Sequence, residues 1–269
     1  MFAKWVRSRL PGLAVFAAAF AWLTAAAPLA HAGTACAFDG APRILLEDGD
    51  PHEAGSRLLQ VWEVRDDPVF RSHTAPRDGA YPRFRAELAE RNVETDPLRL
   101  LERSPTDNNR IVIRNAGDWI GPAGCLEMLL YGHQHGRMNT LDAPTEFTSI
   151  VLRAPEGDRL RVYYYTINQD GIGRMDPIVE PALKDRQDGW EVLVALHNHA
   201  FHPGQPEIDG ILAPSEPDAD FHVRFHAASD LREAWITNGV DTVRMPASSF
   251  DLFRTASDGG GVGNRPERD

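Results

Sequence analysis

The segment GWEVLVALHNHAF, residues 189–201, decides the fold that the sequence predicts. Its residues from 192 to 196 are apolar without interruption, a pattern typical of a central strand whose sheet is covered on both faces. Side chains repeat every two residues along a strand, so we expect His197 and His199 to point the same way at its end. Two imidazoles placed in this way are half of a metal site.

A second segment, APSEPDAD at residues 213–220, has the pattern of a helix start with Ser215 as its N-cap. Asp218 falls on the apolar stripe of this helix, seven residues before Phe225, and should therefore face the sheet. A carboxylate buried there is costly unless it meets a cation. The alternative is a capping box in which Asp218 only accepts backbone hydrogen bonds. We predict that one metal ion is bound by His197, His199 and Asp218.

These segments resemble the pattern of the JAMM (MPN-type, JAB-like) zinc metalloproteases, in which a Glu at an early strand precedes His-x-His, seven residues, Ser, two residues and Asp. Glu146 heads a β-rich run, 51 positions before His197. Two features depart from the family pattern, because fifteen residues separate His199 from Ser215 and Ala200 replaces the usual Pro. The resemblance covers roughly residues 120–254.

The resemblance implies hydrolysis of an amide or isopeptide bond with one zinc ion, Zn2+, as cofactor. Glu146 would be the general base that takes a proton from the metal-activated water. Ser215 would donate a hydrogen bond to the developing oxyanion. A non-catalytic JAMM-like binding or accessory domain of the periplasm is the alternative function, and a zinc hydrolase that acts on an ester or small amide is a weaker one.

Other histidines are alternative ligands. His222 is the strongest of them because it follows Asp218 by one helical turn. His202 is a further substitute, and His226 lies one turn too far. A second His-x-His stands in Gly132-His-Gln-His-Gly136, after a helix predicted over residues 124–131, and we interpret His133 and His135 as polar side chains of a solvated loop.

Residues 1–32 have the pattern of a secretory signal peptide, with basic residues, an apolar run and a small-x-small site that predicts cleavage after Ala32. An uncleaved membrane anchor is the alternative. We expect a periplasmic or secreted protein without stable membrane insertion. Its formal net charge of −11 argues against nucleic acid or an anionic membrane as partner. The expected partner is a peptide or isopeptide substrate from the cell wall or a secreted protein.

The two cysteines, Cys36 and Cys125, both lie in the part expected to be exported. One disulfide is the simplest interpretation in an oxidising compartment, and two buried free thiols are the alternative.

The predicted order of elements favours an α/β fold, a three-layer-like sandwich with a mixed β-sheet, formed by residues 118–254. It includes a hairpin of Phe147–Arg153 with Leu160–Thr166, a helical turn near Glu180–Lys184, and a hairpin around Asn238-Gly239. Residues 33–117 are expected to form an irregular N-terminal extension with mixed short helices, and residues 255–269 a disordered tail. Within the extension, the pattern predicts helices over 53–64 and 81–91 and a strand over 110–114.

Overall fold

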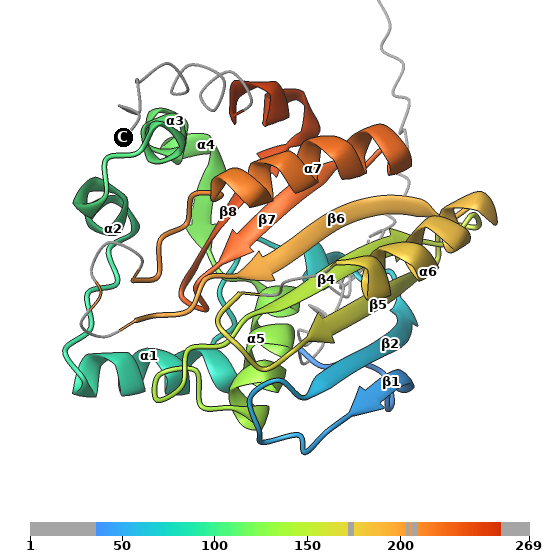
Figure 1. Cartoon of the computed structure of the whole chain (residues 1–269), viewed down its shortest axis with the longest axis horizontal. Helices are drawn as coiled ribbons and strands as arrows, with labels where there is room; N and C mark the ends of the chain where they lie inside the picture. Colours follow the sequence, from blue (N-terminus) through green and yellow to red (C-terminus); the bar gives the residue numbers. More distant parts are fainter. Residues whose placement is uncertain (1–35, 172–174, 203–204, 206–208, 254–269) are drawn as a thin grey trace, which may run out of the picture. The chain divides into compact units, whose positions relative to one another are not determined.

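The computed structural model describes residues 36–171, 175–202, 205 and 209–253 (Figure 1). In these residues one eight-stranded sheet has the order β1-β2-β5-β4-β6-β7-β8-β3. The strands are β1 (Arg43–Asp48), β2 (Arg57–Arg65), β3 (Ile120–Pro122), β4 (Phe147–Arg153), β5 (Arg159–Thr166), β6 (Glu191–Asn198), β7 (Glu233–Thr237) and β8 (Asp241–Pro246). Only β6 and β7 pair in parallel, so the sheet is mixed as predicted.

Helices cover both faces of this sheet (Figure 1). They are α1 (Ala80–Glu90), α2 (Pro97–Arg103), α3 (Asp107–Arg114), α4 (Ala116–Trp119), α5 (Cys125–Arg137), α6 (Asp176–Gln187) and α7 (Glu216–Ser229), with short 3-10 turns at Pro68–Arg71 and Ala247–Ser249. One hydrophobic core joins the sheet to α6 and α7 through residues such as Ile178 and Phe225. A second joins it to α1 and α5 through residues such as Leu88 and Leu130. The predicted α/β sandwich is therefore confirmed.

The segment 189–201 contains the central strand, as predicted. β6 lies between β4 and β7, and its residues from Val192 to Asn198 are all buried. Ala195 packs in the core under α6 and α7, whereas Leu196 packs in the core on the α5 side. A strand that contributes to two cores needs apolar residues at successive positions, and this explains its unbroken apolar run.

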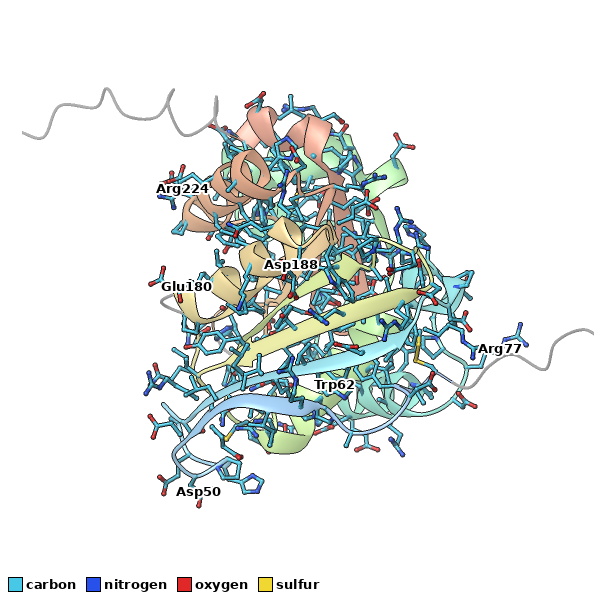
Figure 2. The ribbon with its side chains drawn as sticks, turned by 90° about the vertical axis from the view of Figure 1, so that its right-hand side faces the viewer. Asp50, Trp62, Arg77, Glu180, Asp188 and Arg224 are labelled. Carbon is cyan, nitrogen blue, oxygen red and sulfur yellow. A yellow bond between two sulfur atoms is a disulfide. The ribbon has the colours of Figure 1, made fainter. Side chains whose placement is uncertain are left out.

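The expected N-terminal extension is part of the sandwich. β1 and β2 form one edge of the sheet, seen in Figure 2 with Trp62 on β2 and Asp50 in the turn between the two strands. The helix predicted over 53–64 is wrong, because β2 pairs along its length with β5. Both faces of β2 are covered, so apolar residues occupy successive positions and the apolar–polar alternation of a half-buried strand is missing. The remaining apolar spacing is compatible with a helix. The helix predicted over 81–91 is confirmed by α1.

The strand predicted over 110–114 is also wrong, because these residues belong to α3. An N-cap stabilises the start of this helix, because the Thr106 hydroxyl oxygen accepts a hydrogen bond from the Asn109 backbone N–H at 3.1 Å. Ile111 and Val112 then pack together into the core on one side of a helix, whereas a strand would place them on opposite faces.

Further along the chain, both predicted hairpins are confirmed by the antiparallel pairs β4–β5 and β7–β8. Gly239 turns between β7 and β8 with a φ of 83°, and a Cβ there would lie 2.9 Å from the Phe84 and Tyr131 rings. The turn expected near Glu180–Lys184 is the longer helix α6. The disulfide between Cys36 and Cys125 is present, with the two Cα atoms 5.5 Å apart.

The predicted signal peptide, its cleavage after Ala32 and the predicted tail of residues 255–269 lie outside the described residues. Among the residues that are described, no helix combines the length and the apolar character that crossing a membrane requires.

Candidate metal centre

Two histidines stand where β6 ends. His197 is in the strand, and the backbone N–H of His199 donates to the Thr237 carbonyl at 2.9 Å, so the pairing with β7 continues one residue beyond β6. The strand geometry turns both side chains to the α7 face, where their Nε2 atoms lie 3.1 Å apart. The predicted orientation of the pair is therefore observed.

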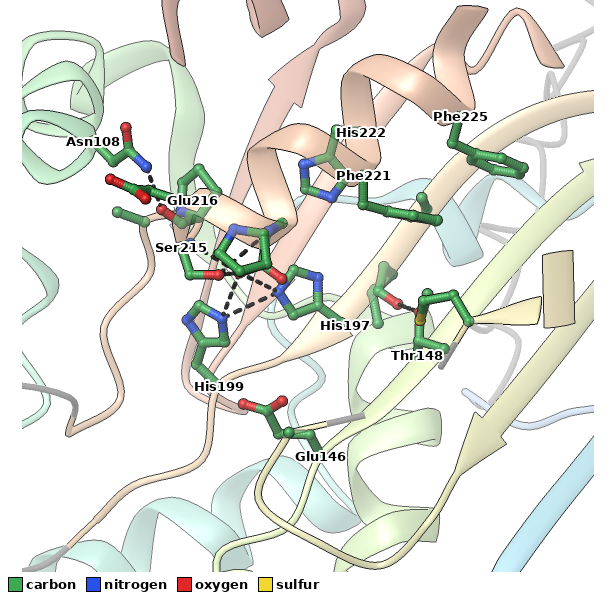
Figure 3. A pocket seen from close by; sticks show the side chains of 18 of the residues that line it. Asn108, Glu146, Thr148, His197, His199, Ser215, Glu216, Phe221, His222 and Phe225 are labelled. Carbon is green, nitrogen blue, oxygen red and sulfur yellow. Dashed lines mark hydrogen bonds and ion pairs between the residues drawn. The ribbon is translucent and has the colours of Figure 1, made fainter. Parts of the chain in front are cut away.

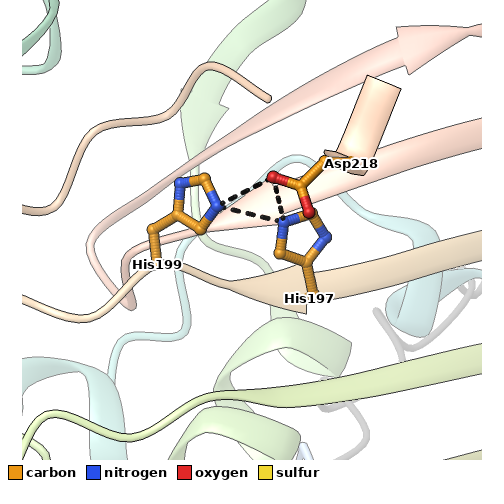
Figure 4. A group of neighbouring side chains, drawn as sticks. All are labelled: His197, His199 and Asp218. Atoms are coloured by element: carbon orange, nitrogen blue, oxygen red, sulfur yellow. Dashed lines mark hydrogen bonds and ion pairs between the residues drawn. The ribbon is translucent and has the colours of Figure 1, made fainter. Parts of the chain in front are cut away.

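Asp218 reaches this pair from the first turn of α7. Its Oδ2 lies 3.5 Å from Nε2 of His197 and 3.4 Å from Nε2 of His199, and Figure 4 shows the three side chains converging. Ligand atoms of all three residues fall within 4.8 Å of one another, and in the described part of the chain no other group of three or more His, Cys, Asp or Glu residues does so. The group can hold a metal ion, as predicted.

The donor set fits a divalent metal on two counts. Two imidazole nitrogens and one carboxylate oxygen are a common protein ligand set for such ions. In addition, Nδ1 of His199 is 2.6 Å from the carbonyl oxygen of Ile211. A carbonyl can only accept, so Nδ1 carries the proton and leaves Nε2 to face the Asp218 carboxylate as a potential ligand atom.

The electrostatics of the metal-free group also favour a cation. Burial is the largest single influence on His199 and lowers its pKa, but the hydrogen bond and charge of Asp218, together with Glu146 and the Ile211 carbonyl, raise this pKa to about 9. Burial works in the opposite sense on Asp218, where the two histidines prevail and hold its pKa well below the ordinary value. His199 and Asp218 thus form an ion pair in the metal-free group, and a metal ion can replace the proton that His199 holds.

Glu146 lies directly before β4, the neighbour of β6. Thr148 is paired with His197 in an antiparallel register, so the same register places Glu146 opposite His199 on one face of the sheet. Figure 3 shows its carboxylate directed toward the two histidines. Burial raises the pKa of Glu146 above its ordinary value, against the pull of His199 and His197. A carboxylate in this position can accept a proton beside the metal group.

Ser215 caps α7, and the capping box that was the alternative interpretation is present. The Ser215 hydroxyl donates to Asp218 Oδ2 at 2.6 Å, and the Ser215 backbone N–H donates to the same oxygen at 2.8 Å. Both interpretations of Ser-x-x-Asp therefore hold together, since Asp218 caps the helix and also faces the histidines. To serve an oxyanion, the Ser215 hydroxyl must first leave Asp218.

The remaining histidines take other positions. The buried His222 ring lies behind His197, with ring centroids 5.9 Å apart, and stacks on Phe250. Burial lowers the pKa of His222 to about 3, so its ring is neutral at ordinary pH. His226 faces the Leu231 carbonyl at 2.8 Å. His202 lines the cavity and pairs with Asp170 at 3.4 Å.

The second His-x-His is not a loop, because α5 continues through both of its glycines to Arg137. His133 lies 2.6 Å from the Gln60 amide nitrogen and is wedged against the Trp62 and Tyr164 rings. His135 is 3.0 Å from the Thr140 hydroxyl. Gly132 and Gly136 favoured a loop after residue 131, but isolated glycines are tolerated inside a helix, and α5 runs through both.

The metal group lies in a cavity of about 1150 Å³ that is bordered by α3, α6, α7 and the sheet. Described residues of the long loop between His199 and Ser215, among them Ile211 and Pro214, line part of this cavity. In the described part of this loop, Ile211 orients His199, and the Asn238 amide donates to the Gly210 carbonyl at 3.0 Å. The sequence does not predict these contacts, because the accepting atoms are backbone carbonyl oxygens, which every residue has.

Comparison of the chain with models of protein families, with curated proteins and with solved structures found no match.

Proposed function

We propose that the protein is a zinc-dependent hydrolase that cleaves an amide bond, a peptidase or isopeptidase of the JAMM type that its motifs resemble. One observation carries this proposal: a carboxylate outside the ligand set, Glu146, faces His197, His199 and Asp218 on the floor of a large cavity. A structural metal site is normally closed and needs no neighbouring base, whereas a catalytic site has three protein ligands and an open position.

Zinc is the ion that suits this ligand set best, since two imidazoles and one carboxylate are typical of catalytic zinc. When bound, zinc lowers the pKa of a coordinated water to about 7 and polarises a carbonyl group.

The chain's own residues would divide the remaining work. Glu146 accepts a proton from the attacking water and passes it to the leaving amine, and its raised pKa makes both transfers easier near neutral pH. Ile211 holds the His199 ring in one tautomer. Ser215, released from Asp218, would donate to the oxyanion that develops on the substrate carbonyl.

The test of the proposal compares wild-type protein with Glu146→Gln, both purified from the periplasm. Gln has the shape of Glu but cannot accept a proton, so zinc content and thermal unfolding should be unchanged. Turnover of a peptide library or a cell-wall digest should fall by about 10²- to 10⁴-fold. Glu90→Gln, at the exposed end of α1, is the matched control. Loss of zinc from Glu146→Gln would make Glu146 a ligand and contradict its role as the base.

Ser215→Ala separates the two roles of Ser215. Loss of the oxyanion donor should lower turnover by about 10²- to 10³-fold at most. Loss of the cap should lower the free energy of unfolding by about 1 kcal/mol. If only the stability changes, Ser215 is a cap and not a catalytic residue.

A binding or accessory domain without turnover is the second candidate. It is favoured by the engagement of Asp218 Oδ2, which already accepts two hydrogen bonds from Ser215. Zinc-loaded wild-type protein that hydrolyses nothing in the panel would establish this alternative. For either function we propose export to the periplasm or medium, with which the Cys36–Cys125 disulfide is compatible.

A further inference from the structure

The cavity beside the metal group has one apolar wall. It runs between α6 and α7 and is formed by Met175, Val179, Leu183, Ala195, Phe221 and Phe225. The Phe221 and Phe225 rings are stacked, with centroids 5.3 Å apart. Met175, Val179, Leu183 and Phe221 pack against the core yet remain only partly buried. Apolar surface of this kind, open to a cavity, is what a ligand's apolar group can cover.

The wall across the metal group is polar and acidic. It is lined by Asn108 and Asp107 of α3 and by Glu216 at the start of α7. Figure 3 shows Asn108 and Glu216 on one side of the histidines and Phe221 and Phe225 on the other. Arg224 is the one Arg or Lys among the described lining residues, and it is largely exposed and 3.8 Å from Asp220. A cleft lined by carboxylates attracts cations and repels anions.

Substrate geometry connects these two walls. A carbonyl that is attacked at the metal group belongs to a residue whose Cα carries a side chain in one direction and an amino group in another. An apolar wall on one side and an acidic wall on the other match these two substituents.

We propose that the cavity selects peptides in which the residue on the carbonyl side of the scissile bond is large, apolar and amino-terminal. Its side chain lies between α6 and α7, and its positively charged amino group faces the acidic wall. This inference rests on the proposed function for the scissile bond, but the two walls can be tested without turnover.

The experiment measures binding to zinc-loaded wild-type protein by calorimetry, with three hydroxamates as metal-anchored probes. Phenylalanine hydroxamate should bind about 10- to 100-fold more tightly than glycine hydroxamate, because its ring is buried. N-succinyl-phenylalanine hydroxamate, in which the amine is replaced by a carboxylate, should bind more weakly than phenylalanine hydroxamate. Equal affinity of the phenylalanine and glycine probes, or no binding of either, overturns the inference.

Matched variants locate each preference. Val179→Thr keeps the shape of a cavity residue but makes it polar, and it should weaken binding of phenylalanine hydroxamate about fourfold while glycine hydroxamate is unaffected. Val223→Thr is the control, because it makes the same change on α7 at a partly buried position outside the cavity lining.

The acidic wall is tested at Glu216. Glu216→Gln should narrow the difference in affinity between the free-amine and succinyl probes, whereas Glu180→Gln on the exposed side of α6 should leave this difference unchanged.

The outcomes separate this inference from the proposed function. If the probes show the expected order but no peptide is hydrolysed, the cavity preference stands and the hydrolase proposal fails. If peptides are hydrolysed and the probes show no preference for the ring or the free amine, the hydrolase proposal stands and this inference fails.

Discussion

The side chain of Asn198 is hydrogen-bonded to the backbone on both sides of Glu146. Its amide nitrogen donates to the Thr145 carbonyl at 3.0 Å, and its Oδ1 accepts from the Phe147 N–H at 2.7 Å. Asn198 is the middle residue of His-x-His, and its fully buried side chain points to the face opposite the metal group. One strand end therefore supplies two candidate ligands on one face and fixes the position of the candidate base from the other.

Replacing Asn198 by Asp should separate this positioning from metal binding. The carboxylate keeps the size of Asn and can accept from Phe147, but it cannot donate to Thr145 and would face a carbonyl oxygen. We expect zinc content to be retained and the free energy of unfolding to fall by about 1–3 kcal/mol. Turnover of any substrate found should fall with kcat lowered and KM nearly unchanged, because the base is displaced and the cavity is not.

The control is Asn115→Asp, which breaks a comparable bond from a side-chain amide to the Ile111 carbonyl at the end of α3. If Asn198→Asp lost zinc and activity in proportion, the residue would support the ligands rather than Glu146.

The candidate metal site itself is tested most sharply at Asp218. Asp218→Asn retains an oxygen that can accept the two bonds from Ser215, so α7 should keep its cap while the charged ligand is lost. We expect about one zinc per chain in the wild type and none in Asp218→Asn or His197→Ala, measured by elemental analysis. His226→Ala, on the same helix, should keep its zinc. Loss of zinc from His133→Ala or His135→Ala would place the site on α5 instead.

The sequence was sufficient to predict the centre of the molecule. An unbroken apolar run specifies a central strand, period two places His197 and His199 together, and helical phase turns Asp218 toward them. Each inference depends only on local geometry, and the three support one another because they place His197, His199 and Asp218 at the same strand end. The hairpins at residues 147–166 and 238–239 were predictable for the same reason, since their turn residues are local signals.

The parts that could not be predicted depend on partners distant in sequence. Strand β2 forms at residues 57–65 because β5, a hundred residues later, pairs with it. The contacts of Asn198 with β4 and of Ile211 with His199 join side chains to backbone atoms, and backbone atoms leave no trace in composition or spacing. Residues 110–114 are a local exception, because they alternate like a strand and yet follow the Thr106 cap that begins the helix α3.

Stability at mildly acidic pH should depend on His133, which lies away from the metal group. Burial, with a smaller contribution from Arg137, lowers the pKa of His133 from 6.5 to about 4. Its Nε2 faces a Gln60 amide nitrogen, which can only donate, so the ring must be neutral at that atom. Between these pKa values the unfolded chain binds a proton that the folded protein does not, and the free energy of unfolding therefore falls as pH falls from about 6.5 to 4.

His133→Gln should remove about 1–2 kcal/mol of this pH dependence, measured by urea unfolding at pH 7 and pH 5 in the presence of a chelator. His52→Gln, at an exposed position, is the control and should leave the pH dependence as it is in the wild type. If the free energy of unfolding of His133→Gln changed between pH 7 and pH 5 as much as that of the wild type, His133 would already be protonated in the folded protein at pH 5.

The last prediction concerns the Cys36–Cys125 disulfide, which ties the chain before β1 to the first residue of α5. The bridge closes a loop with a sequence separation of 89 residues, worth at most about 4–5 kcal/mol in the chain-entropy model. Mass spectrometry without reductant should show the two cysteines linked. The Cys36→Ala, Cys125→Ala double variant should unfold at a lower temperature than the wild type. Reductant should lower the unfolding temperature of the wild type toward that of the variant, and should leave the unfolding temperature of the variant unchanged.

The same variant should keep its zinc. Cys125 is buried in the core on the α5 side of the sheet, whereas His197, His199 and Asp218 lie on the α7 side with the buried strands between them. Loss of the bridge therefore removes a constraint on the unfolded chain without moving a ligand. If the double variant lost zinc at a temperature where it remains folded by circular dichroism, the two faces would be coupled, and the positions of β4 and β6 would have to depend on the bridge.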